Sequence, residues 1–391
     1  MKKIRERRDL AIHGAPPAFA APLHVGRPNI GDREAFLSLV SEILERRWLT
    51  NNGPLVRRLE ERIAALHGVR HCVAMCNGTI ALEIAIRALG LKGEVIVPSF
   101  TFIATAHALH WQEIVPVFAD IRGDTHTLDP DAVESMITPR TSGIIGVHTW
   151  GRCCDVEGLQ AVADRHGLRL LFDAAHAFGC AYGGTRVGNF GACEVLSFHA
   201  TKFFNTFEGG AVLTNDDALA EQMRLMRNFG FAGLDNVIHP GTNGKMTEVA
   251  AAMGLVNLDA VDGIVQANRR NHTLYKALLD PLPGVRVLDY DPAQDPNYQY
   301  VVAEIGRDCP VGRDRLLEAL RAENVLARRY FWPGCHRMQP YRDLYPHAGL
   351  LLPVTERIAG EVLVLPTGTG LPEQDIRTLC AVVSTVVGAS V

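Results

Sequence analysis

The sequence predicts an α/β fold with a large, mostly parallel sheet domain and a small C-terminal α/β domain. Short apolar runs alternate with helical patterns along the chain, which is typical of βαβ units around a parallel sheet. The length of 391 residues favours two domains and is sufficient for a large buried core. With 47% hydrophobic and 21% charged residues, the composition is that of a soluble globular protein.

Helices are predicted where apolar residues recur with a helical period, and strands where short apolar runs stand between turn signals. The first helix spans residues 33–47, and the turn-rich segment 48–54 separates it from a second helix at 56–66. Two further helices, at 80–89 and ending at residue 109, each follow a strand. The predicted strands lie at 71–75, 94–97, 115–118, 143–148, 168–172, 195–198 and 211–214.

The C-terminal part has strand and helix signals of its own, after a stretch with proline and glycine at 280–284. We therefore place the domain boundary within 260–285, in a long connecting helix. Residues 1–265 are assigned to an N-terminal arm and the large domain, and residues 266–391 to the small domain.

Charge and cysteine content exclude several classes of protein. The net charge of −4 argues against a nucleic-acid or polybasic membrane binder. The basic first eight residues are followed by Pro16 and Pro17, so we expect a loose arm rather than a signal peptide. No apolar run is long enough for a transmembrane helix. Nine cysteines without paired metal-ligand spacing favour free thiols, no metal site and a cytoplasmic location.

The strongest chemical signal is Lys202, which follows the strand at 195–198 in a small, polar, glycine-rich setting. A lysine withdrawn from water has a lowered pKa and can attack a carbonyl group. Most lysines are solvated surface residues, so the interpretation depends on the neighbouring motifs.

An acid and a histidine follow the strand at 168–172. Asp173 stands at the carboxyl end of that strand, where ligands bind in open α/β sheets, and His176 comes three residues later. A carboxylate there can pair with a protonated ring nitrogen such as that of pyridoxal phosphate (PLP). Asp173 can equally cap the following helix, and His176 can be a core residue.

A third motif, residues 77–79 with Gly78 and Thr79, follows a strand and begins a helix. Free backbone N–H groups and the helix dipole can hold a phosphate at such a turn. Phe102, after the next strand, can stack on a flat ring or belong to the core. A phosphate turn, an aromatic ring, an acid and a lysine thus each follow a strand.

These motifs resemble the DegT/DnrJ/EryC1/StrS family of PLP-dependent sugar aminotransferases, over nearly the whole chain from about residue 20. The resemblance implies the fold type I, aspartate aminotransferase-like architecture. The motifs that carry it are WLTNNGP at 48–54, NGT at 77–79, PSFTF at 98–102, DAAH at 173–176, SFHATK at 197–202, EGG at 208–210 and NGKMTE at 243–248.

The resemblance implies how PLP is held. Lys202 would carry the cofactor as a Schiff base and shuttle a proton, and Asp173 would keep the pyridine nitrogen protonated. The phosphate would lie against Gly78, Thr79 and Ser197. The ring would stack on Phe102.

It also implies a homodimer with shared active sites. Asn243 would reach the phosphate in the neighbouring subunit, and Lys245 would meet an acidic part of the substrate or remain a solvated loop lysine. Many relatives have Gln where this chain has His176, which would still hydrogen-bond the phenolic oxygen of PLP and adds a titratable group. Dehydratase relatives have histidine in place of the Schiff-base lysine, so Lys202 favours transamination.

The segment 327–336 is similar to the family's C-terminal active-site loop, in which Tyr330 and His336 would contact the substrate. The alternative for Tyr330, Phe331 and Trp332 is an aromatic loop that packs under the small domain. The sequence of this segment resembles that of the family's 4-aminotransferases more than that of its 3-aminotransferases. We therefore expect transfer of an amino group from L-glutamate to the C4 ketone of a nucleotide-linked sugar such as dTDP-4-keto-6-deoxyglucose. The alternatives are a C3-specific aminotransferase, a cyclitol aminotransferase acting on a ketone such as scyllo-inosose, or a non-catalytic PLP-binding regulator.

Overall fold

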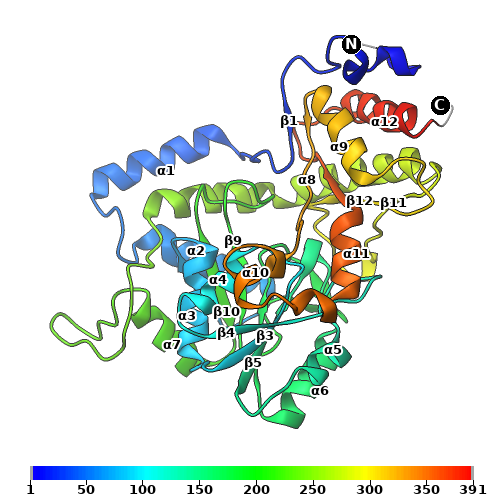
Figure 1. The fold of residues 1–391 in the computed structure, drawn as a ribbon. Helices are drawn as coiled ribbons and strands as arrows, with labels where there is room; N and C mark the ends of the chain where they lie inside the picture. Colours follow the sequence, from blue (N-terminus) through cyan, green and yellow to red (C-terminus); the bar gives the residue numbers. More distant parts are fainter. Residues whose placement is uncertain (1–2, 389–391) are drawn as a thin grey trace.

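A seven-stranded, mostly parallel sheet forms the centre of the computed structural model, which describes residues 3–388 (Figure 1). The strand order is β2-β10-β9-β6-β5-β3-β4, and only β10 runs antiparallel to its neighbours. The predicted α/β architecture is confirmed. The strands are β2 (His71–Met75), β3 (Glu94–Pro98), β4 (Val115–Ala119), β5 (Thr141–Val147), β6 (Arg169–Asp173), β9 (Glu194–Ser197) and β10 (Gly210–Thr214).

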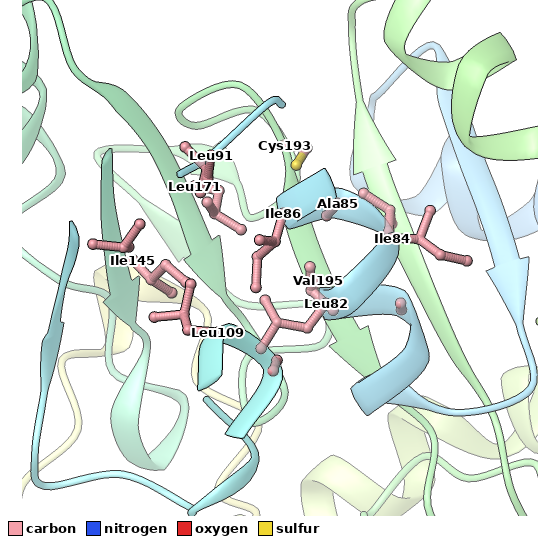
Figure 2. Close-up of a cluster of buried hydrophobic side chains, with 14 of the residues drawn as sticks. Leu82, Ile84, Ala85, Ile86, Leu91, Leu109, Ile145, Leu171, Cys193 and Val195 are labelled. Atoms are coloured by element: carbon pink, nitrogen blue, oxygen red, sulfur yellow. The ribbon is translucent and has the colours of Figure 1, made fainter. Parts of the chain in front are cut away.

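Helices cover both faces of this sheet because successive side chains of each strand point to opposite sides. In β2, Val73 packs with α3 (Gly78–Ala88) on one face, and Ala74 packs with α2 (Pro54–His67) on the other. Figure 2 shows how Leu82 and Ile86 of α3 face Val195 and Leu109 in the first of these cores. The remaining helices around the sheet are α4 (Ala104–His110), α5 (Pro130–Ser135), α6 (Val156–His166) and α7 (Asp217–Met226).

The long helix α8 (Glu248–Leu279) connects the large sheet to a small antiparallel sheet with its own core (Figure 1). The small sheet has the order β11-β12-β14, with β11 (Val285–Val287), β12 (Val301–Ile305) and β14 (Val362–Leu365). Helices α9 (Arg313–Ala322) and α12 (Glu373–Val387) pack against it. The domain boundary at residue 265 falls within α8 and stays a prediction.

The remaining helices and strands complete the described chain. The helices among them are α1 (Arg33–Arg46), α10 (Tyr341–Leu344) and α11 (Pro353–Glu361). The strands are β1 (Leu23–His24), β7 (Ala181–Tyr182), β8 (Thr185–Arg186) and β13 (Val325–Leu326). The 3₁₀ helices are η1 (Arg7–Asp9), η2 (Ala11–His13), η3 (Thr149–Gly151), η4 (Pro292–Gln294), η5 (Cys335–Arg337) and η6 (Ala348–Leu351).

The N-terminal arm is not loose, contrary to the prediction. Leu10 is only 1% exposed and belongs, with Phe19, to the core of the small sheet. The Glu323 carboxylate accepts hydrogen bonds from the backbone of Ala11 and Ala18, and β1 pairs in parallel with β13. The arm therefore packs in space with the C-terminal part of the chain, to which its apolar side chains are complementary (Figure 1).

Two properties bear on the class of protein. Within residues 3–388, no helix combines the length and apolar character needed to span a bilayer. The same residues contain no cluster of three or more His, Cys, Asp or Glu side chains placed to hold a metal ion.

Candidate active site

A cavity of about 550 Å³ lies where the predicted motifs meet, at the carboxyl ends of β5, β6 and β9 and beside the start of α3. Parallel strands end at one edge of a sheet, so motifs far apart in the sequence meet there. The predicted site residues that line this cavity are Gly78, Thr79, Phe102, Asp173, His176, Ser197, Lys202 and Tyr330.

Lys202 lies in the loop between β9 and β10, and Asn29 holds this loop with two hydrogen bonds. Asn29 donates from its side chain to the Phe203 carbonyl at 3.1 Å, and Asn205 donates to the Asn29 carbonyl at 2.9 Å. Desolvation lowers the pKa of Lys202 to about 8, although the negative charge of Asp173 opposes this shift. A substantial fraction of the lysine is therefore the neutral, nucleophilic amine near neutral pH.

Asp173 ends β6 and is buried, with both carboxylate oxygens engaged. Oδ1 accepts from the backbone N–H of Ala175 at 3.1 Å, and Oδ2 accepts from the hydroxyl of Thr105 at 2.8 Å. The first contact is a local turn cap, so the structural use expected for an acid at this position is present. The same carboxylate lines the cavity that Lys202 lines, which leaves it available to a cationic group of a ligand.

The turn at the start of α3 has the geometry of an anion site. The Asn77 side chain caps the helix by accepting from the Ile80 N–H at 2.8 Å, while the first amides of a helix have no intrahelical partner. A Cβ at Gly78 would lie 2.9 Å from the Cβ of Ser197, so only glycine lets the turn approach this serine. Backbone N–H groups and two hydroxyls, from Thr79 and Ser197, thus border one end of the cavity.

His176 is buried at the cavity wall and is neutral. Burial, and then the nearby charge of Lys202, hold the pKa of His176 well below its ordinary value. Its Nδ1 accepts from the backbone N–H of Trp150 at 3.3 Å, so the proton of the neutral ring is assigned to Nε2. The histidine therefore offers a hydrogen-bond donor, and the titratable group expected from the sequence is held uncharged.

Aromatic side chains form the remaining wall. The ring of Phe331 stacks parallel to that of His176, with centroids 5.8 Å apart, and Tyr300 meets His176 edge-on at 5.0 Å. Phe102 is exposed toward the cavity and Tyr330 lines it, as the C-terminal loop motif predicted. Tyr300, Phe331 and Thr105 were not among the predicted site residues. No local motif marks Tyr300 or Thr105, and only the tertiary structure places them here.

Two predicted residues lie outside this cavity in the same chain. Asn243 is exposed, and its side-chain oxygen accepts from Lys245 Nζ at 2.7 Å, while Nζ lies 4.7 Å above the ring of Phe229. Residues 243–245 run beside the strand end that leads into the turn at the start of α3, because the Cys76 N–H donates to the Gly244 carbonyl at 2.8 Å. Neither side chain lines the cavity of its own chain.

His336, which the sequence predicts to contact the substrate, lies away from the cavity lining. His336 is only 2% exposed and does not line the cavity. Its Nδ1 lies 2.6 Å from the Ser99 hydroxyl, and its Nε2 lies 2.7 Å from the Glu356 carboxylate. These two contacts tie η5 to the segment that follows β3 and to α11, so the imidazole has a structural role.

The donor set at the cavity fits PLP. The cofactor has an aldehyde, a phosphate, a ring nitrogen that is protonated in its electron-sink role and a phenolic oxygen. The aldehyde matches the amine of Lys202, and the phosphate matches the Gly78–Thr79 turn with Ser197. The protonated ring nitrogen matches the Asp173 carboxylate, and the phenolic oxygen matches the Nε2–H of His176. The glycine that admits Ser197 to the turn is the most restrictive feature of this cradle.

Known proteins with similar sequences or structures include sugar transaminases. The crystal structure of DesI with its TDP-sugar product is 52% identical, with a TM-score of 0.93 and a match over 97% of this chain and 96% of that chain. The dTDP-4-amino-4,6-dideoxy-D-glucose transaminase of Escherichia coli is 37% identical over 90% of this chain and 95% of the enzyme. The GDP-perosamine synthase of Caulobacter vibrioides is 35% identical over 93% and 98%, respectively.

The family model described as the DegT/DnrJ/EryC1/StrS aminotransferase family matches residues 31–384. The match includes every predicted site residue, from Gly78 to His336. This chain therefore belongs to the DegT/DnrJ/EryC1/StrS family of PLP-dependent aminotransferases.

Proposed function

We propose that this enzyme transfers the amino group of L-glutamate to the C4 ketone of a nucleotide-linked 4-keto-6-deoxy sugar, with dTDP-4-keto-6-deoxyglucose as the expected acceptor. The observation that carries the proposal is a desolvated lysine and a buried aspartate lining one cavity beside an anion-binding turn. The substrate class rests on the relatives named for dTDP-4-amino-4,6-dideoxy-D-glucose and for a TDP-sugar product.

The residues have distinct proposed roles. PLP supplies an electron sink that stabilises negative charge at the carbon from which a proton is removed. Asp173 would hold the ring nitrogen in its charged form, and His176 would donate its Nε2–H to the phenolic oxygen. Because the pKa of Lys202 is about 8, its free amine can take a proton from the Cα of the amino donor and return one to the sugar carbon.

The cavity walls would bind the rest of the ligands. Phe102 and Tyr330 line the cavity, and in this proposal Phe102 would stack on the cofactor ring and Tyr330 would contact the sugar. Thr79 and Ser197 would hold the phosphate with the free amides of the turn. Apolar aromatic rings on this wall also exclude water from the reacting atoms.

A homodimer with shared active sites is part of the proposal. Asn243 and Lys245 do not line their own cavity, and the loop between α7 and α8 projects from the body (Figure 1). Leu234 on this loop is 94% exposed, and neighbouring apolar side chains are exposed as well. Such an apolar projection is typical of a protein–protein interface.

We also propose a cytoplasmic location. All nine cysteines are free thiols, and most of them are buried. Cysteine-rich chains without disulfides are typical of reducing compartments.

The test is an assay of the PLP-loaded protein with L-glutamate and dTDP-4-keto-6-deoxyglucose, with the amine identified by NMR. We expect stoichiometric 2-oxoglutarate and a 4-amino sugar, and we expect Lys202→Ala to lose both turnover and the visible absorbance of bound PLP. The 3-keto isomer, a GDP-linked 4-keto sugar and scyllo-inosose serve as competing acceptors. Amination at C3, preference for the cyclitol, or turnover by Lys202→Ala would refute the assignment.

A further inference from the structure

Two threonine hydroxyls stand in line behind the carboxylate of Asp173. The Thr105 hydroxyl donates to Asp173 Oδ2 at 2.8 Å, and the hydroxyl oxygens of Thr105 and Thr101 are 2.9 Å apart. Thr105 is 0% exposed and does not line the cavity, whereas Thr101 is 2% exposed and lines it. The hydrogen bond between Thr105 and Asp173 is therefore shielded from bulk water.

The direction of these hydrogen bonds follows from the number of protons. A threonine hydroxyl has one hydrogen, and that of Thr105 is used on Asp173. Thr105 can therefore only accept from Thr101, so the Thr101 hydroxyl must be the donor in the second bond. The two hydroxyls are oriented toward the aspartate, which accepts at the end of the row.

The Thr105 hydroxyl makes its contact outside its own helix. Thr105 is the second residue of α4, so no turn of that helix precedes it. Here the hydroxyl leaves its own helix and reaches the end of β6 instead. Its backbone N–H donates to the Phe102 carbonyl at 3.1 Å, so the same turn fixes one wall of the cavity.

We propose that Thr105 is a positioning residue that fixes the Asp173 carboxylate in the orientation needed for the cofactor ring nitrogen, with Thr101 orienting the Thr105 hydroxyl. The Ala175 N–H holds the other carboxylate oxygen, so the two contacts together prevent rotation of the group. A buried carboxylate also requires hydrogen bonds to remain charged. The inference rests on the proposed function, because the ring nitrogen belongs to PLP.

The test compares Thr105→Val, which removes the hydroxyl at constant shape, with Thr105→Ser, which keeps it. For the Val variant we expect kcat to fall by roughly tenfold to a hundredfold, as for loss of a hydrogen bond to a charged group, with little change in the KM for glutamate. We also expect weaker PLP binding and a shifted pH midpoint of the bound-PLP absorbance. The Ser variant should restore all three to within about threefold of the wild type.

Thr385→Val is the matched control, because Thr385 of α12 is buried and its hydroxyl has no hydrogen-bond partner within the described chain. It should leave kcat, PLP affinity and the pH midpoint unchanged. If Thr105→Val does not fold, Thr101→Val replaces it as the test, because it removes the hydroxyl that orients Thr105. We expect this variant to shift the pH midpoint of the bound-PLP absorbance less than loss of the Thr105 hydroxyl would.

The outcomes separate this inference from the proposed function. A Thr105→Val enzyme, or in its absence a Thr101→Val enzyme, with wild-type kcat, PLP affinity and pH midpoint would overturn the positioning role while leaving the aminotransferase assignment intact. Equal losses in Thr105→Val and Thr105→Ser would also overturn it, because the hydroxyl would not be the cause. A wild-type protein that neither binds PLP nor transaminates would remove both.

Discussion

Lys202 shows how one side chain acquires its chemistry from its surroundings. Withdrawal from water lowers its pKa to about 8, and the Asp173 carboxylate, which favours the charged ammonium, limits the shift. The Asp173 carboxylate is itself held in place by two hydrogen bonds, from the Ala175 N–H and the Thr105 hydroxyl. The amine of Lys202 can therefore act both as a nucleophile and as a carrier of protons, and transamination requires both functions.

The rate at which PLP attaches to the cofactor-free enzyme should therefore rise with pH through about 8, because only the neutral amine attacks the aldehyde. From pH 7 to pH 9 the neutral fraction, and with it the rate, should increase roughly tenfold. Stopped-flow absorbance measures this rate. In Asp173→Asn the charge that raises the lysine pKa is lost, so the midpoint should move below that of the wild type. A rate that keeps rising to the ordinary lysine range would contradict the desolvated amine.

Residues that follow buried strands were predictable from the sequence, since strand ends are local features and ligands bind there. Lys202, Asp173 and the Gly78 turn all line the cavity for this reason. Thr105 and Tyr300 were not predictable, because their contacts with Asp173 and His176 depend on how separate segments pack. The roles assigned to the lining residues stay predictions until variants are measured.

At the level of elements, the arm formed by residues 3–24 is the clearest difference between expectation and structure. The apolar side chains of the arm are few and irregularly spaced, and they stand among basic residues and prolines. No periodic pattern therefore predicts that these side chains are buried. Their partners lie about three hundred residues away in sequence, in α9, α12 and the small sheet. The large-sheet strands, by contrast, were found within one or two residues because each is a continuous apolar run.

The burial of Leu10 leads to a stability prediction. Leu10→Ala should lower the free energy of unfolding by about 2–4 kcal/mol, because it leaves a cavity in a packed core. Denaturant unfolding measures the change. Leu350→Ala, at a side chain that is 80% exposed, is the matched control and should stay within about 0.5 kcal/mol of the wild type. Equal stabilities of Leu10→Ala and the control would mean that the arm does not contribute to the core.

For the whole molecule, the proposed dimer explains why one chain carries site residues that its own cavity does not use. Asn243 and Lys245 bond to each other, and Gly244 between them accepts from the Cys76 N–H, just before the turn at Gly78. In a two-fold dimer the same surface meets its counterpart, so a residue that leaves one site can enter the other. Each site would then consist of Lys202 from one subunit and Asn243 from its partner.

Subunit complementation tests this arrangement. Lys202→Ala homodimers have no lysine in either site, and Asn243→Ala homodimers lack the phosphate contact in both. A heterodimer of the two, purified through two different affinity tags, places the intact Lys202 and the intact Asn243 in the same one of its two sites. We expect this heterodimer to have about half the wild-type kcat, well above either homodimer, because one of two symmetry-related sites is complete. If instead Lys202 and Asn243 served the same site from one chain, both sites of the heterodimer would be defective, and its activity would not exceed half that of the Asn243→Ala homodimer.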